Sequence, residues 1–210
     1  SEGELSCWGQ PVAIPAGLDV VGEVAVSANS QVCVLRAIDN RVRCFGRDLP
    51  DDVPAPDSPL QNLTAGFDFA CALDRATRQP LCWGTADFGV LDAPEVEMTT
   101  IDAGSSATCG LTAGGTIQCW GEDIGGQLDP PDGQYVSLSM GGYTGCAIDV
   151  DGQADCWGLG RLDDGRQYGQ GQPPVEPLSL VSMGAAHGCG LTESNAIVCW
   201  GAGGPEDGNA

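Results

Sequence analysis

Residues 107–121 read ATCGLTAGGTIQCWG and carry the pattern that decides the fold, because two cysteines flank a glycine-rich turn and the second opens a Cys-Trp-Gly tripeptide. The same tripeptide begins at Cys7, Cys82, Cys119, Cys156 and Cys199, and a Cys-Phe-Gly variant begins at Cys44. The spacings between these cysteines are 37, 38, 37, 37 and 43 residues. A fixed period of this length indicates a repeat architecture in which each unit is one supersecondary element.

A second cysteine lies ten or eleven residues before each of the last five motifs, at Cys33, Cys71, Cys109, Cys146 and Cys189. Facing residues of an antiparallel hairpin have index sums fixed by the centre of the loop, which for Cys146 and Cys156 is Asp151. The turn is then a three-residue loop with Gly152 at its left-handed position, and the same arithmetic puts Asn195 there in the last unit. Cysteines that face each other on such strands lie within disulfide reach. We predict the bridges Cys33–Cys44, Cys71–Cys82, Cys109–Cys119, Cys146–Cys156 and Cys189–Cys199. Zinc sites would need close C-x2-C pairs, which the chain lacks.

Each unit also has an apolar stretch about ten residues before its first cysteine, so it reads as three strands followed by a polar loop. The units span approximately 20–46, 58–84, 95–121, 133–158 and 175–201, with a partial unit at 5–9. Three strands cannot bury both faces alone, so neighbouring units must stack. We expect an all-β fold in a single repeat domain, 1–210: a β-propeller-like array of about five three- to four-stranded blades. An N-terminal orphan strand would add to the fifth blade or belong to a partial sixth. The recurring Trp then packs between blades.

Charge and cysteine content bound the environment and the partners. The chain has 29 acidic residues against eight Arg and no Lys, a formal net charge of −21, which excludes nucleic acid and disfavours anionic membranes. Eleven cysteines, read with the hairpin pairing, indicate an oxidising compartment. No apolar run is long enough to cross a bilayer. We expect a secreted, extracellular or cell-surface protein without membrane insertion. Since the chain opens at Ser1 rather than Met, we also expect that a targeting segment was removed or left out.

The unit resembles the repeats of the regulator of chromosome condensation family. The resemblance lies in Gly-x-x-x-x-Cys-(Ala/Gly)-Leu, a hairpin, Cys-Trp-Gly and a Gly-Gln-containing loop, as in residues 104–111 followed by 119–128, and again in 184–191 followed by 199–201. His187 stands where that family often carries His. The resemblance covers about residues 5–201 and implies a propeller that recognises proteins through its loops and uses no cofactor. The short repeats, disulfides and acidity look like the secreted bacterial branch, in which one relative inhibits β-lactamase through one face of its ring.

Carboxylates gather in the loops that follow each Cys-Trp-Gly motif. Equivalent loops of a propeller open on the same side, so these carboxylates would form an acidic rim around one face. The rim is either solvated surface or a place for a basic partner or a weakly held cation. The last such loop, 159–177, is longer than the others by about six residues and contains Arg and Tyr, which are favoured interface anchors. The predicted binding residues are Asp51, Asp87, Asp123, Asp129, Arg161, Asp163, Asp164, Arg166 and Tyr168.

No constellation of residues points to catalysis or to a metal. The single histidine, His187, has no accompanying G-x-S-x-G nucleophile motif, and a structural role is the simpler interpretation. Residues 149–155 echo part of a calcium loop but lack its distant Glu, and their Asp-Gly is already explained as a turn. The expected function is an extracellular or cell-surface protein–protein binding module, not an enzyme. The alternatives are a structural subunit that self-assembles into a fibre or sheath, and a secreted enzyme inhibitor.

Cys7 is the cysteine that this pairing scheme leaves over. Its partner strand would lie upstream of Ser1. We expect Cys7 either to make an intermolecular contact or disulfide, which would give a dimer or a head-to-tail chain, or to remain a buried or capped free thiol. The protein partner could therefore be a second copy of this chain.

The charge predicts that salt stabilises the protein. Repulsion among the carboxylates destabilises the compact state in dilute buffer, and ions screen it. The melting temperature should rise between about 0.01 M and about 1 M NaCl. An unchanged midpoint would contradict self-repulsion, and a much larger response to calcium than to sodium at matched ionic strength would support a cation site.

Overall fold

The computed structural model describes residues 5–7, 14–15, 18, 20–27, 31–46, 58–85, 87–158 and 169–202. Within these residues the chain forms five antiparallel sheets of three strands, here called blades 1 to 5, so the predicted all-β propeller-like fold is confirmed. One short 3-10 turn, η1 (Asp87–Gly89), follows the second blade. The strands are β1 (Val21–Val26), β2 (Gln31–Arg36) and β3 (Val42–Gly46); β4 (Leu60–Ala65), β5 (Phe69–Asp74) and β6 (Pro80–Gly84); β7 (Met98–Ala103), β8 (Ala107–Thr112) and β9 (Ile117–Gly121); β10 (Tyr135–Met140), β11 (Thr144–Asp149) and β12 (Ala154–Gly158); β13 (Leu178–Met183), β14 (His187–Thr192) and β15 (Ile197–Gly201).

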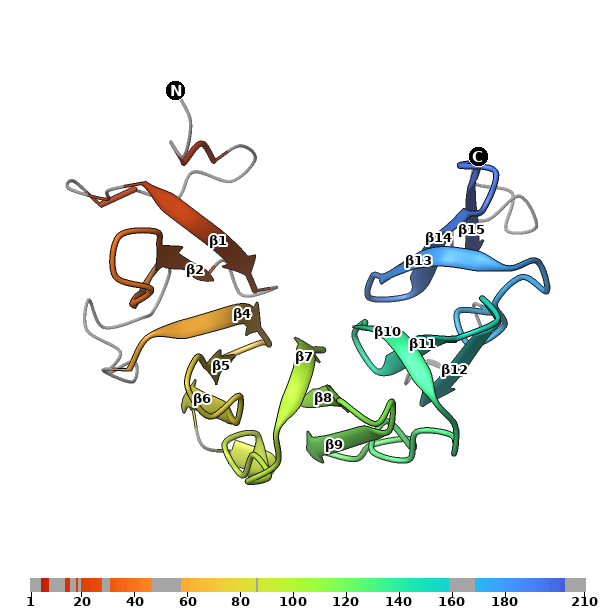
Figure 1. The fold of residues 1–210 in the computed structure, drawn as a ribbon, viewed down its shortest axis with the longest axis horizontal. Helices are drawn as coiled ribbons and strands as arrows, with labels where there is room; N and C mark the ends of the chain where they lie inside the picture. Colours follow the sequence, from red (N-terminus) through yellow and green to blue (C-terminus); the bar gives the residue numbers. More distant parts are fainter. Residues whose placement is uncertain are drawn as a thin grey trace.

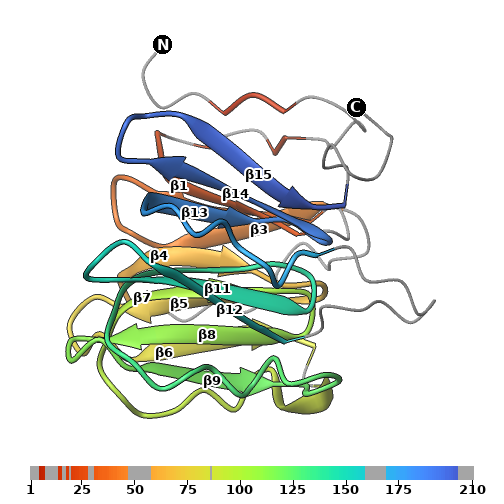
Figure 2. The same ribbon diagram turned by 90° about the vertical axis from the view of Figure 1, so that its right-hand side faces the viewer.

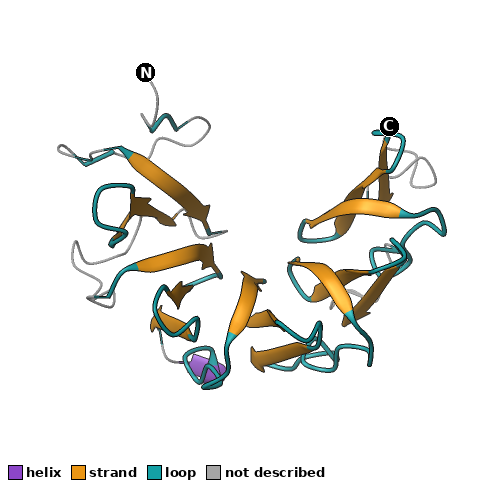
Figure 3. Cartoon of the chain, in the orientation of Figure 1, coloured by secondary structure: helices purple, strands orange, loops and turns teal. Residues whose placement is uncertain are grey.

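The blades follow one another around an open arc, with blade 1 and blade 5 at its two ends (Figure 1). The first strand of each blade lies on the inside of the arc, and consecutive first strands contact each other. In the view turned by 90°, the strands of all five blades run across the thickness of the arc (Figure 2). Tight loops join them, and η1 lies at the outer edge of the arc, after blade 2 (Figure 3).

The hairpins have the predicted register. In every blade the first cysteine faces the second across the ladder, the two Cα atoms lie 4.0–4.1 Å apart, and all five predicted disulfides form. A residue with positive φ stands near the end of each turn, as the tight reversal requires. The left-handed positions predicted for Gly152 and Asn195 are confirmed, with φ of 82° and 62°. The cysteine spacing therefore fixes both the pairing and the turn.

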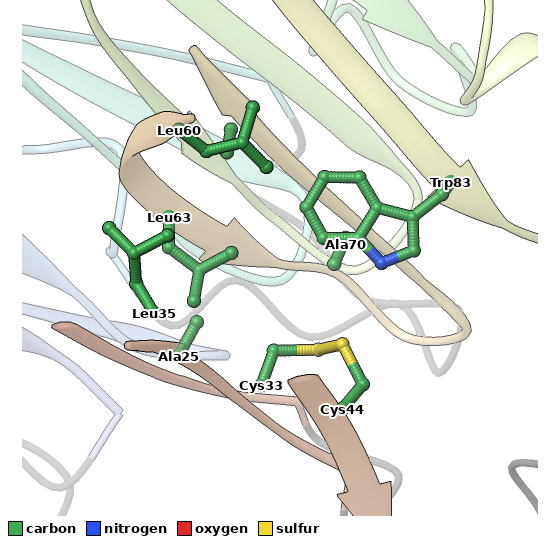
Figure 4. Packing of buried hydrophobic residues seen from close by; sticks show 9 residues of the cluster. Ala25, Cys33, Leu35, Cys44, Leu60, Leu63, Ala70 and Trp83 are labelled. Carbon is green, nitrogen blue, oxygen red and sulfur yellow. A yellow bond between two sulfur atoms is a disulfide. The ribbon is translucent and has the colours of Figure 1, made fainter. Parts of the chain in front are cut away.

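Each recurring Trp within the described residues packs against the disulfide of the preceding blade. In blade 2, Trp83 lies with Leu60 and Leu63 over the Cys33–Cys44 bridge of blade 1 (Figure 4). Trp120, Trp157 and Trp200 repeat this packing on the bridges of blades 2, 3 and 4. The indole N–H groups of the last two donate to backbone carbonyl oxygens in the preceding loops, those of Gln127 (3.0 Å) and Gln170 (2.9 Å). The predicted packing of Trp between blades is confirmed.

Polar side chains on the first strands tie each blade to the next. Thr64, Asp102 and Ser139 each stand opposite the first cysteine of their own blade. Their side-chain oxygens accept hydrogen bonds from backbone N–H groups of the following blade, which belong in order to Ala103 (2.9 Å), Met140 (2.8 Å) and Met183 (3.1 Å). In blade 1, Glu23 accepts in the same direction from the N–H of Leu63 (2.7 Å). These bonds satisfy first-strand amides that face the inside of the arc.

Asp102 is the centre of this hydrogen-bond chain. The Oδ1 atom of Asp102 accepts hydrogen bonds from the Thr64 hydroxyl (3.0 Å) and from the N–H of the next residue, Ala103 (3.0 Å). Its Oδ2 atom accepts from the Ser139 hydroxyl (3.2 Å) and from the N–H of Met140 (2.8 Å). Burial between the strands raises the pKa of Asp102 above its ordinary value, in spite of these donors. The carboxylate therefore joins three blades at a cost in desolvation.

The predicted N-terminal orphan strand is not found in the part of the chain that the structure describes. Leu5 to Cys7 form no strand, and Trp8 and Gly9 lie outside the described residues. A strand needs a neighbour to complete its backbone hydrogen bonds; Leu5 instead packs against the apolar residues around Phe45 in blade 1. Cys7 is a free and exposed thiol, so the expectation of a buried thiol is wrong. Its intermolecular bond stays a prediction.

Blade 5 exposes a surface that the other blades cover. In blades 1 to 4 the next blade packs on the face that carries the disulfide. In blade 5 the corresponding residues His187, Ile197 and Cys199 are exposed. The equivalents of His187 in the three preceding blades are all buried: Phe69, Ala107 and Thr144. Blade 5 thus presents an open copy of the interface that joins the others.

The raised pKa of Asp102 predicts a pH-dependent difference between the protein and Asp102→Asn. Because the folded pKa lies above the unfolded one, the native state binds the proton more tightly, and that stabilisation is lost as pH rises through the folded pKa. Lowering the pH from neutral should therefore raise the free energy of unfolding of the unsubstituted protein relative to Asp102→Asn. Urea titrations at several pH values measure this difference. Asp151→Asn, in an exposed turn, is the matched control, and parallel pH profiles for all three proteins would contradict the assignment.

Candidate functional site

Two sets of loops open on the same side of the arc, which we call the loop face. One set consists of the turns between first and second strands, at residues 66–68, 104–106, 141–143 and 184–186. The other set follows the third strands of blades 2 and 3, at residues 85, 87–97 and 122–134. Backbone bonds hold the two sets together, since the N–H of Thr85 donates to the carbonyl of Asp68 (2.9 Å) and that of Glu122 to the carbonyl of Ser106 (2.8 Å).

The described residues include three of the predicted binding residues. Asp87, Asp123 and Asp129 are all exposed in loops that follow β6 and β9. The other six lie outside the described residues: Asp51, Arg161, Asp163, Asp164, Arg166 and Tyr168. Asp123 is partly engaged in its own loop, because its Oδ1 accepts from the N–H of Gly126 (2.7 Å). Asp87 also lines a cavity, to which Asp123 and Asp129 do not contribute.

That cavity, of about 370 Å³, opens on the loop face between blades 2 and 3. Its volume is in the range of small-ligand sites. The turns of blades 2, 3 and 4 and the loops after β6 and β9 all contribute to its walls. The lining residues are Phe67, Asp68, Phe69, Thr85, Asp87, Phe88, Val90, Ser105, Ser106, Glu122 and Tyr143. We call it the loop-face cavity.

Aromatic side chains give the loop-face cavity much of its wall. Phe67 and Phe88 are 47% and 67% exposed, unusual values for Phe, and Tyr143 is half-buried. Phe88 also has φ of 60° and ψ of 21°, the left-handed region that bulky residues rarely adopt. A strained, exposed aromatic residue at the edge of a cavity is the kind of outlier that accompanies binding sites.

The backbone beneath the loop-face cavity is closely packed. The N–H of Phe67 donates to the carbonyl of Ser105 (2.8 Å), and the N–H of Ser105 donates to that of Gly142 (3.1 Å), so three consecutive turns are joined edge to edge. This approach requires glycine, because a Cβ at Gly104 would lie 2.3 Å from the carbonyl oxygen of Gly141. The cavity therefore rests on a connected backbone rather than on independent loops.

Charge in the loop-face cavity is of one sign. Asp68, Asp87 and Glu122 line it, and none of the described lining residues is basic. The hydroxyl of Ser106 is shielded from solvent and has no hydrogen-bond partner among the described residues. The site combines aromatic surface with the carboxylates of Asp87 and Glu122, which suits binding of a group that is both flat or apolar and positively charged.

The sequence pattern predicts Asp87 as a site residue but not Phe67, Phe88 or Tyr143. A signal was present, since Phe67 and Asp68 occupy turn positions where the next unit has Ser105 and Ser106. Large side chains at positions that need only a short turn are departures from the repeat. The repeat pattern could not tell which departures meet in space.

No group of three or more His, Cys, Asp or Glu side chains gathers within the described residues in a way that would hold a metal ion. His187 begins β14 and is exposed, away from the residues that line the cavity. None of the helical segments described is long and apolar enough to cross a membrane.

Comparison with protein families places residues 98–127 in a match to the regulator of chromosome condensation (RCC1) repeat. The matched segment covers blade 3 and the Gly-Gln loop after it, and blades 2, 4 and 5 repeat the same strands, turns and Trp packing. The chain is an RCC1-like repeat protein. The predicted family is thereby confirmed, whereas its secreted bacterial branch stays a prediction.

Solved structures agree with the RCC1-like fold. The CRINKLY WD40 ectodomain of the Arabidopsis thaliana receptor kinase ACR4 is 26% identical over 92% of this chain and 67% of that chain, with a TM-score of 0.73. The ectodomain of the Physcomitrella patens receptor kinase CR4 is 27% identical over 86% and 53%, with a TM-score of 0.71. Prp20p of Saccharomyces cerevisiae is 16% identical over 87% and 58%, with a TM-score of 0.70, which shows likeness of fold. The RCC1-like chain thus spans 53% to 67% of the length of these structures.

The backbone of Phe88 predicts an unusual order of stability among its variants. Glycine adopts a φ near +60° without strain. Alanine has a Cβ atom, so the left-handed backbone conformation costs it about 1 kcal/mol. Phe88→Gly should therefore unfold at higher urea than Phe88→Ala, although both lose the same aromatic ring. A lower midpoint for the glycine variant would show that position 88 is not held in the left-handed region.

Proposed function

We propose that this RCC1-like protein is an extracellular or cell-surface protein-binding module, without catalytic activity, that engages its partner through the loop face. The observation that carries the proposal is the loop-face cavity, where two exposed Phe side chains and three carboxylates meet above a connected backbone. Exposed aromatic residues on a fixed backbone are favoured anchors of protein interfaces, because little conformational freedom is lost when they are buried.

The disulfides and the relatives support the location. The protein has five disulfides. Disulfides persist in oxidising compartments and are rare in the cytosol. The two most similar structures described above are ectodomains of receptor kinases. Prp20p, which shares the fold, is described with binding properties to Gsp1p and histones, so the same architecture serves protein recognition in that case. The identity of the partner does not carry over at these identities.

A second candidate function, self-assembly into a fibre or sheath, has one observation in its favour. The disulfide face of blade 5 is open, and in the other blades this face is covered by a blade of the same kind. A second copy could cover it in a head-to-tail contact, which does not close and so propagates. Sedimentation of the purified protein over a range of concentrations separates this candidate from a monomeric binding module.

Loss of the two exposed Phe side chains should abolish capture of the partner. The protein is immobilised and exposed to the culture medium of its source, and retained proteins are compared with those held by Phe67→Ser/Phe88→Ser. Val150→Ser is the matched control, because Val150 is 71% exposed in the β11–β12 turn, at the other end of its strand from the loop face. We expect the control to retain the same protein as the unsubstituted chain and the double variant to lose it.

Equal retention by all three proteins would contradict the proposal. Circular dichroism and melting temperature must agree among them, so that the loss reflects the surface and not unfolding. Because the two Phe side chains are 47% and 67% exposed, their replacement by Ser removes part of their buried apolar area, and the double variant is used only if it remains folded by these two measurements.

A further inference from the structure

We propose that the loop-face cavity binds a cationic side chain of the partner, and that arginine is the residue it fits best. This inference rests on the proposed function, since it names the chemistry that the loop face recognises. It follows from the aromatic walls of the cavity, from its charge and from the number of its acceptors, each of which restricts the occupant.

The walls select for a cation that can lie flat. Phe67, Phe88 and Tyr143 come from three separate segments and line one cavity. The face of an aromatic ring attracts cations through its quadrupole, and a guanidinium group also stacks on it. Since Phe67 and Phe88 remain largely exposed, the cavity leaves aromatic surface uncovered that such a group would bury.

The charge excludes the other classes of occupant. Asp68, Asp87 and Glu122 would repel a phosphate, a carboxylate or a nucleic acid. A purely apolar occupant would strip water from the carboxylates of Asp87 and Glu122 without giving them a partner, which is unfavourable. A cation satisfies the carboxylates and the aromatic rings at once, and apolar walls strengthen the attraction by lowering the local dielectric.

The number of acceptors favours arginine over lysine. Guanidinium has five N–H donors in a planar fork, whereas an ammonium group has three around a point. The carboxylates of Asp87 and Glu122 line the cavity from two different loops, which follow β6 and β9. A planar donor with several N–H groups can reach acceptors on opposite walls while its face lies on a ring.

The test uses three short probes in place of the partner: acetyl-Gly-Arg-Gly-amide, its lysine counterpart, and its citrulline counterpart, which has nearly the shape of arginine without the charge. Binding is followed by titration calorimetry and by NMR of the protein. We expect the arginine probe to bind with a dissociation constant of about 1 mM, as a single anchor residue would. The lysine probe should bind more weakly than the arginine probe. The dissociation constant of the citrulline probe should be at least about tenfold higher than that of the arginine probe.

Variants connect the binding to the cavity. Asp87→Asn/Glu122→Gln removes charge and keeps the shape of the side chains, and Phe88→Ser removes an aromatic ring. Each change should reduce the affinity for the arginine probe by about tenfold. Val150→Ser should bind as the unsubstituted protein does. Added salt should lower the affinity for the arginine probe and leave the affinity for the citrulline probe unchanged, because only the arginine probe is held by charge.

Equal binding of the arginine and citrulline probes, or no binding by either at about 10 mM, would overturn the inference. Tighter binding of lysine than of arginine would overturn the preference for a planar cation. The proposed function is judged separately. If Phe67→Ser/Phe88→Ser loses the captured protein while the arginine probe binds no better than citrulline, the loop face binds a protein but not through a cationic side chain.

Discussion

The contact between a Trp side chain and the disulfide of the preceding blade is the interaction on which the rest of the structure depends. A three-stranded sheet has two faces and cannot cover either one alone. Here the bridge fixes two strands and forms an apolar platform, and the Trp of the next blade covers it. The blades keep the same spacing because this contact is the same each time. The curvature of the arc, and so the meeting of loops from three blades, follows from it.

The fold could be predicted from the sequence because hairpin geometry ties sequence distance to spatial distance. Cysteines ten or eleven residues apart leave one register for the two strands, and a left-handed residue such as Gly152 or Asn195 then falls where the turn needs it. The hydrogen bonds of Asp102 could not be predicted in this way. They join strands about 38 residues apart, and the pattern of apolar residues is silent about polar contacts between blades. The expected N-terminal strand is not seen at Leu5 to Cys7, and the Trp8 and Gly9 of its motif lie outside the described residues, so it stays a prediction.

The candidate site was only partly predictable for a related reason. Counting carboxylates after each Cys-Trp-Gly motif located Asp87, but it gave equal weight to Asp123, whose oxygen is used within its own loop. The aromatic residues of the cavity come from positions that are not equivalent in the repeat: Phe67 from a turn, Phe88 from η1 and Tyr143 from the turn of another blade. Their meeting depends on the angle between blades, which no local pattern specifies.

The bonds that backbone N–H groups make to side chains between first strands all run one way: an N–H group of the following blade donates to a side-chain oxygen of the blade before it. Each unit of about 37 residues therefore carries one half of a contact at its leading side and the complementary half at its trailing side. A tandem copy of such a unit, made by recombination in frame, would arrive with both halves already matched to its neighbours. The array can then grow or shrink in evolution without redesign of its joints, while side chains on the loops are free to diverge.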